Sequence, residues 1–142
     1  MSFQDILSSQ ALGFVQIPLN LVIGGMNATS TIRYDDFVRK LFKEDTYEQM
    51  VNHAALGVCG EAGELADALK KHVHYRKPLD RKNVVEELGD LRFYIQAVQN
   101  LFGITEQEIL QHNADKLGER YAGLVYSDSS AIARADKKEG EA

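Results

Sequence analysis

The sequence predicts an all-α protein, a bundle of four main helices that is preceded by an extended N-terminal arm. Apolar residues recur at helical spacing through most of the chain after residue 31. Helix-capping residues precede the periodic segments, and short loops join them. The first residues lack that spacing. We therefore divide the chain into an arm over 1–30, a helical domain over 31–126, and a short turn or helix with a charged tail over 127–142.

Composition restricts the classes to which the chain can belong. A chain of 142 residues can bury a core without disulfides, and a net charge of −5 with no basic run argues against a nucleic-acid partner. The single cysteine, Cys59, excludes an intramolecular disulfide and fits a reducing, cytoplasmic compartment; we expect it to be buried. The apolar run over 11–26 is interrupted by Pro18 and polar residues, so we expect no membrane span and no membrane partner.

The N-terminal arm has the pattern of a strand. Apolar residues occupy the odd positions from Val15 to Ile23, whereas the even positions are mixed. Pro18 would confine such a strand to the edge of a sheet. We expect the arm to pack on its own bundle or on a neighbouring subunit, and a loosely held extension is the alternative.

The first two helices are predicted over 32–43 and 45–74. An amphipathic stripe that begins at Tyr34 marks the first. Capping-box spacing between Asp45 and Glu48 opens the second. Three glycines inside the second helix indicate that a neighbouring helix or a ligand comes close to its backbone. These are Gly57, Gly60 and Gly63.

The last two main helices are bounded by capping signals. Asp80 is the predicted N-cap of a helix over 81–101, and Gly103 lies just past its end. Thr105 and Glu108 have capping-box spacing, and Thr105 opens a fourth helix that runs to Tyr121. The four helices and their short connections define the bundle.

Two pairs of acids on the second and third helices form the candidate catalytic and metal-binding centre. Residues three apart on a helix are neighbours, so each pair presents two carboxylates on one face: Glu61 with Glu64, and Glu87 with Asp90. If the two helices pack antiparallel, the four carboxylates converge and require a cation. Such oxygen ligands suit Mg²⁺, with Mn²⁺ as a substitute. Ordinary exposed charge is the alternative for such pairs.

Three segments of the chain carry a resemblance to a known family: GEAGELADALKK, EELGDLRFYIQAVQNLFGI and NADKLGERYAG. They are similar to the MazG-type nucleoside triphosphate pyrophosphohydrolases, an all-α family, and the likeness spans residues 34–126. Many members carry a further Glu where this chain has Gly60, so the chain is closer to the small single-module, phage-like members.

This resemblance implies an activity and roles for the acids. The activity is Mg²⁺-dependent cleavage of a (d)NTP to (d)NMP and pyrophosphate, for nucleotide-pool control or house-cleaning. The acids Glu61, Glu64, Glu87 and Asp90 would hold the metal. Either Glu61 or Glu64 would position or deprotonate the attacking water.

Basic side chains near the acids are the candidate phosphate ligands. Lys71 lies two turns after Glu64 on the same helix face. Lys116 and Arg120 lie one turn apart on the fourth helix, with Asn113 one turn earlier, and all three belong to the segment that resembles the family. Ordinary surface charge is the alternative for these cations.

Three further residues are weaker candidates for binding the nucleotide. His53 lies two turns before Glu61, and Tyr94 lies one turn after Asp90, so either is a candidate to stack on or hydrogen-bond the base. Arg134 resembles a basic residue of phage-type members, and it is a candidate phosphate ligand across a subunit boundary.

The resemblance also implies a homodimer or homotetramer, because the small members of the family assemble in this way. Two other functional interpretations stay open. One is a related helical pyrophosphohydrolase that acts on phosphoribosyl-ATP or a guanosine alarmone. The other is a non-catalytic helical interaction module, against which the presence of all four acids argues.

Overall fold

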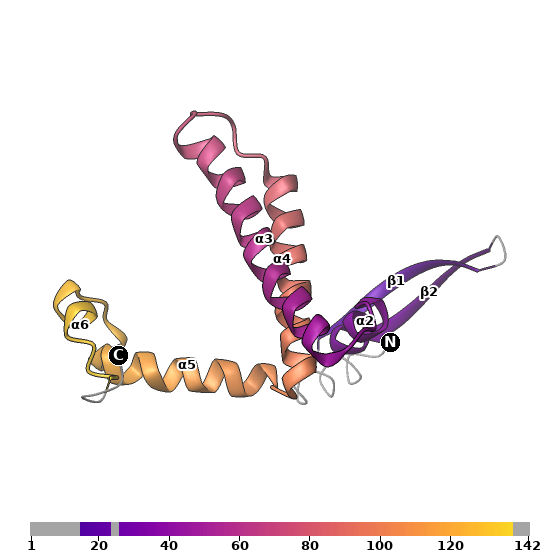
Figure 1. Cartoon of the computed structure of the whole chain (residues 1–142). Coiled ribbons are helices and arrows are strands. Elements are labelled where there is room, and N and C mark those ends of the chain that lie inside the picture. Colours follow the sequence, from indigo (N-terminus) through magenta and orange to yellow (C-terminus); the bar gives the residue numbers. More distant parts are fainter. Residues whose placement is uncertain (1–14, 24–25, 138–142) are drawn as a thin grey trace. The chain divides into compact units, whose positions relative to one another are not determined.

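The computed structural model describes residues 15–23 and 26–137 (Figure 1). It divides into two compact units, Met1–Ile104 and Thr105–Ala142, which we describe separately. The predicted division into arm, helical domain and tail stays a prediction. Parts of the predicted arm and of the charged tail lie outside the described residues.

The described chain is mostly helical and begins with a β-hairpin, which confirms the predicted fold class and the extended N-terminal segment (Figure 1). No helix among the described residues is both long enough and apolar enough to cross a bilayer. The elements in order are β1 (Gln16–Ile23), β2 (Met26–Arg33), α2 (Tyr34–Leu41), α3 (Tyr47–Val73), α4 (Arg81–Phe102), α5 (Glu106–Arg120), the 3₁₀ turn η1 (Ala122–Leu124) and α6 (Asp128–Ala133).

Strands β1 and β2 pair antiparallel, from Gln16 opposite Arg33 to Ile23 opposite Met26. Both strands of a two-stranded ribbon are edge strands, so Pro18 is tolerated in β1. The prediction of a helix from residue 32 was wrong, because residues 32 and 33 end β2. The alternation in β2 (MNATSTIR) is weak, because Ser30 interrupts the apolar series Met26, Ala28 and Ile32; its β-branched residues also favour a strand.

Capping explains where the helices begin and end. Thr46 is the N-cap of α3 in place of the predicted Asp45, because the Thr46 hydroxyl accepts the Gln49 N–H at 3.3 Å. The other predicted caps are confirmed. Asp80 accepts the N–H of Asn83 at 3.1 Å, and Gly103 ends α4 with a φ of 65°.

The cap of α5 is also as predicted. Thr105 accepts the Glu108 N–H at 3.1 Å, and the Glu108 carboxylate accepts the Thr105 N–H at 2.7 Å. This reciprocal pair is a capping box, and it satisfies two backbone donors that the first turn would otherwise leave without partners.

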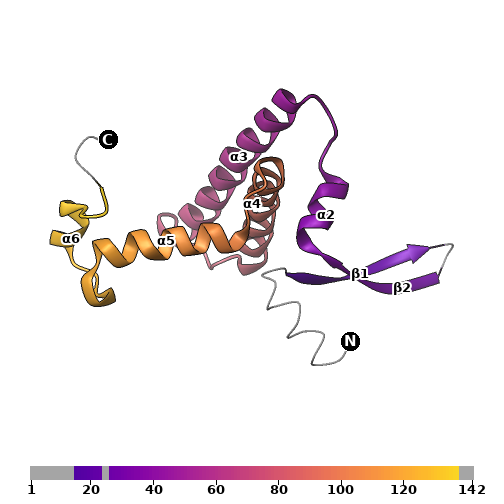
Figure 2. The ribbon, with the colours of Figure 1, turned by 90° about the horizontal axis from the view of Figure 1, so that it is seen from below.

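Helices α3 and α4 form an antiparallel hairpin, in which they lie side by side in both views (Figures 1 and 2). A short connection over residues 74–80 joins them. Helix α2 packs against α4, where the Asn100 amide donates to the Asp35 carbonyl at 3.0 Å. The buried cluster at this junction contains Val38, Ala54 and Ala97.

The glycines of α3 differ in their surroundings. A Cβ on Gly57 would lie 2.2 Å from the Cδ1 of Tyr94, so only glycine admits the Tyr94 ring there. This confirms the predicted close approach of a neighbouring helix at Gly57 alone. Gly60 and Gly63 have open space where a Cβ would stand. Cys59 is exposed, so the prediction of a buried cysteine was wrong.

Candidate functional site

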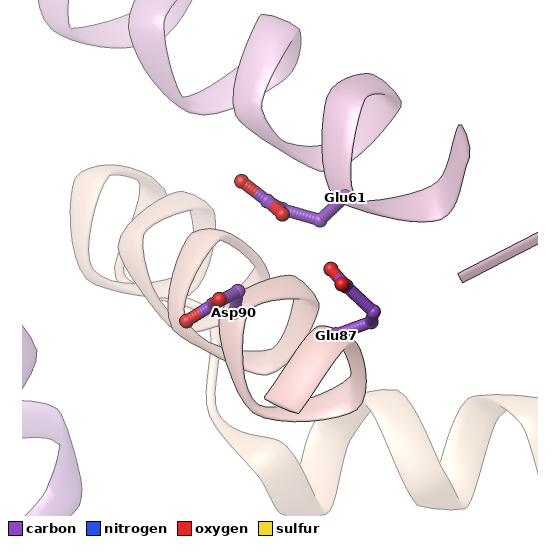
Figure 3. Close-up of side chains that lie close together, drawn as sticks. All are labelled: Glu61, Glu87 and Asp90. Atoms are coloured by element: carbon purple, nitrogen blue, oxygen red, sulfur yellow. The ribbon is translucent and has the colours of Figure 1, made fainter. Parts of the chain in front are cut away.

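Three of the four predicted acids converge between α3 and α4. Glu61 reaches from α3 toward Glu87 and Asp90 on α4 (Figure 3). One carboxylate oxygen from each lies within 4.8 Å of the other two. The antiparallel pairing of the helices produces this convergence, because it brings the middle of α3 beside the first half of α4.

Burial differs among the three acids and changes their ionisation. Glu87 is only 8% exposed, Glu61 is half-buried and Asp90 is exposed. Burial raises the pKa of Glu87 above its ordinary value, and the charges of Glu64 and Glu61 raise it further. Burial likewise raises the pKa of Glu61, to which Glu64 and Asp90 add. The three carboxylates therefore repel one another, and a bound cation would relieve that repulsion.

The donor set fits a hard divalent cation. Three carboxylate oxygens within 4.8 Å need only small side-chain rotations to become neighbouring ligands of one octahedral Mg²⁺, which stand about 3 Å apart. A magnesium ion is usually held by one or two carboxylates, with waters and substrate phosphates at the other positions. Glu61, Glu87 and Asp90 thus match Mg²⁺ or Mn²⁺ by the type of ligand atom and by its spacing.

The fourth predicted acid, Glu64, lies beside the three-acid cluster. It is exposed on α3, one turn beyond Glu61, and its charge acts on both Glu61 and Glu87. Glu64 and Glu87 share an open depression of about 430 Å³. The lining residues are Gly60, Gly63, Glu64, Asp67, Lys71, Asn83 and Glu87.

Lys71 lies where its spacing predicts, in the same depression as Glu64. Its Nζ is 2.8 Å from one Asp67 oxygen, and the Nζ of Lys70 is 2.5 Å from the other. These two lysines lower the pKa of Asp67 to about 2, so its carboxylate is charged at neutral pH. Sequence reasoning missed Asp67, although its spacing of three and four residues from the lysines is an ordinary helical ion-pair signal.

His53 and Tyr94 belong to one row of aromatic rings. The His53 ring is stacked on Phe42, with centroids 4.8 Å apart, and it meets Tyr94 edge-on at 5.6 Å. Tyr94 is half-buried against Gly57. A second pocket, of about 220 Å³, lies at the junction of α2 and α3. It is lined by Lys43, Asp45, Gln49, Met50 and His53.

The other predicted phosphate ligands belong to the second unit. Asn113, Lys116 and Arg120 lie on α5, and Arg134 is the exposed C-cap of α6. The Arg120 guanidinium donates from Nε and Nη2 to the two Asp136 oxygens, at 2.6 and 2.7 Å. Sequence spacing gives no signal for this contact, which joins residues sixteen positions apart. The role of these four residues in binding phosphate stays a prediction.

Comparisons with known proteins place most of the helical segment of the chain in a known family. The family model of the MazG nucleotide pyrophosphohydrolase domain matches residues 49–124, a segment that includes all four acids. The Gene 37 protein of Mycobacterium phage L5 is 28% identical over 74 residues, which cover 49% of this chain and 65% of the phage protein. No solved structure is significantly similar to the chain. Because the family model spans more than half of the sequence, the chain belongs to the MazG nucleotide pyrophosphohydrolase domain family.

Proposed function

We propose that the protein is a Mg²⁺-dependent pyrophosphohydrolase that cleaves a (d)NTP to (d)NMP and pyrophosphate, and so acts in nucleotide-pool control or house-cleaning. The observation that carries this proposal is the convergence of Glu61, Glu87 and Asp90 from two antiparallel helices. These acids lie inside the segment that matches the family, and their oxygens suit the cation that nucleotides carry.

The reaction is the addition of water across the bridge between the α- and β-phosphates. The water oxygen bonds to the α-phosphorus. The bond between the α-phosphorus and the bridging oxygen breaks, and pyrophosphate leaves with that oxygen. The water's protons pass to a base and to the products. When bound, Mg²⁺ supplies neutralisation of phosphate charge and a lowered pKa of the attacking water.

The positions of the acids indicate which of them would hold the cation and which would accept the water's proton. Glu61, Glu87 and Asp90 would hold the cation, since their oxygens are the ones that converge. Glu64 is exposed beside them, and we assign to it the task of accepting the water's proton. Its place outside the three-acid cluster favours Glu64 over Glu61 as the base.

Lys71 would donate to the phosphate oxygens of the substrate. It lines the same depression as Glu64 and Glu87, and Asp67 holds its ammonium there in the absence of substrate. An exposed ion pair of this kind is weak, so a triphosphate can displace it. The family resemblance adds Asn113, Lys116, Arg120 and Arg134 as further proposed phosphate ligands.

A homodimer or homotetramer is the proposed assembly. Several large apolar side chains on the α3–α4 hairpin are exposed, and exposed apolar surface is typical of an interface where it forms a patch. A second hairpin packed on the first would complete a four-helix bundle. The exposed side chains are Leu56, Leu69, Val73, Val85, Leu88 and Phe102.

Product analysis tests the proposed reaction. The protein is incubated with each of the four NTPs and four dNTPs, with phosphoribosyl-ATP and with a guanosine alarmone, and the products are resolved by ³¹P NMR. We expect a nucleoside monophosphate and pyrophosphate from at least one NTP or dNTP. A nucleoside diphosphate and orthophosphate would contradict the assigned bond. Turnover of only the last two substrates would favour the related pyrophosphohydrolases instead.

A further inference from the structure

One face of α3 carries residues of both the pocket at Gln49 and the depression at Glu64. His53, Glu64 and Lys71 are separated by eleven and seven residues, which are close to whole numbers of helical turns, so their side chains leave α3 in nearly the same direction. His53 and Glu64 are therefore about 16 Å apart along the helix axis. A nucleoside triphosphate is long enough to extend from the first pocket toward the acids.

The pocket at the N-terminal end of this face has the chemistry of a base-binding site. Gln49 offers an amide that both donates and accepts hydrogen bonds, and Met50 offers a polarisable apolar surface. His53 adds a ring, while Lys43 and Asp45 form an ion pair at 3.1 Å within the lining. The pocket therefore combines the apolar contact of Met50 with several hydrogen-bonding groups.

The surrounding rings hold His53 in place. Phe42 covers one face of the imidazole, and the edge-on Tyr94 restricts it from α4. Tyr94 is in turn seated on Gly57, where no other residue would admit it. The α3–α4 contact thus sets the position of the pocket wall, which a site that discriminates between ligands requires.

We propose that this pocket binds the nucleobase of the substrate and that Gln49 determines base preference by hydrogen-bonding its polar edge. The inference rests on the proposed function, and it adds the residues that select among nucleotides. An amide can pair with a base edge that places one donor beside one acceptor. His53 contributes a hydrogen bond or edge contact, since Phe42 already occupies one of its faces.

A binding experiment tests this site without turnover. The protein is titrated with each of the four deoxynucleoside monophosphates in the absence of metal, and side-chain NMR resonances are followed, with inorganic phosphate as the base-free probe. We expect the Gln49 amide and His53 ring signals to shift with at least one nucleotide and to stay unchanged with phosphate. Equal shifts with phosphate, or no shift with any nucleotide, would overturn the assignment.

A second experiment measures the hydrolysis of each dNTP by variants of Gln49, with Asn52→Ala as the matched control. Asn52 carries the same amide on an exposed face of α3 and does not line the pocket. We expect Gln49→Ala to lower kcat/KM for the preferred dNTP about tenfold relative to the others, and Gln49→Glu to re-rank the bases because a donor becomes an acceptor. An equal loss for all dNTPs would contradict base selection. Absence of hydrolysis by the wild type would instead refute the proposed function.

Discussion

Glu87 is the most buried of the acids that converge between α3 and α4. Its carboxylate faces Glu61 and Asp90, so ionising all three in the absence of a cation destabilises the fold. Glu87→Gln removes one charge from this cluster and keeps the shape of the side chain. We expect the variant to unfold at a higher temperature than the wild type without metal. Added Mg²⁺ should raise the melting temperature of the wild type and leave that of the variant unchanged.

Glu86→Gln is the matched control for this experiment. Glu86 is the preceding residue, is exposed and lies outside the three-acid cluster. Its variant should retain the rise in melting temperature that Mg²⁺ produces in the wild type. Thermal unfolding followed by circular dichroism, with and without Mg²⁺, measures all three proteins. A Glu87→Gln protein that Mg²⁺ still stabilises fully would show that this residue is not a metal ligand.

The Arg120–Asp136 pair gives a second expectation for single residues. The side chain of Asp136 is 1% exposed, and Arg120 lowers its pKa from 3.8 to about 2. A lowered pKa means that the pair stabilises the second unit fully above about pH 4 and ceases to do so as the pH falls toward 2. The protection of the α6 amides against hydrogen exchange, relative to the intrinsic rate at each pH, should therefore fall over that range. Asp136→Asn should exchange fast at neutral pH already, and unchanged protection in this variant would contradict the anchoring role.

At the scale of elements, the contact between α3 and α4 depends on Gly57. A Cβ there would overlap the Tyr94 ring, so Gly57→Ala should displace the ring and destabilise the protein by about 1–3 kcal/mol. Gly89→Ala on α4 meets nothing within 4 Å, and it should stabilise by about 0.5–1 kcal/mol through helix propensity. Urea unfolding measures both. Similar effects of the two substitutions would show that the close contact does not constrain the helices.

Local sequence signals predict where helices and strands end better than they predict what those elements pack against. The caps at Asp80, Gly103 and Thr105 follow from residues that act on their own helix, so the sequence contains all the information needed. Strand β2 is hard to predict because Ser30 interrupts its apolar alternation, and its pairing with β1 is not a local signal. The glycine spacing indicates a close approach to α3, but Tyr94 becomes its partner only through the alignment of the two helices.

The candidate site also has parts that local spacing predicts and parts that it does not. Helical spacing predicts that each acid pair shares a face, and a hairpin brings the pairs together. It does not predict that Glu64 stands beside the cluster, because this depends on the rotation of α3 about its axis. Nor does spacing reveal the long-range contact of Arg120 with Asp136.

At the scale of the whole molecule, the exposed apolar side chains of the α3–α4 hairpin bear on assembly. Leu88 is 49% exposed on α4, and a lysine there would oppose the packing of a second hairpin. We expect the wild type to be a dimer or tetramer by light scattering, and Leu88→Lys to shift it toward the monomer. Leu124→Lys, at a still more exposed position on η1 (84%), is the control. Dissociation by the control alone would exclude the hairpin as the interface.

The central claim is that a cation held between α3 and α4 supports nucleotide hydrolysis. The most direct test measures pyrophosphate release from each dNTP and NTP by wild-type protein and by Glu87→Gln, with and without Mg²⁺. The account predicts Mg²⁺-dependent release by the wild type and at least a hundredfold loss in the variant, about 2.7 kcal/mol in transition-state stabilisation. Equal release by the two proteins, or release that is independent of Mg²⁺, would contradict it.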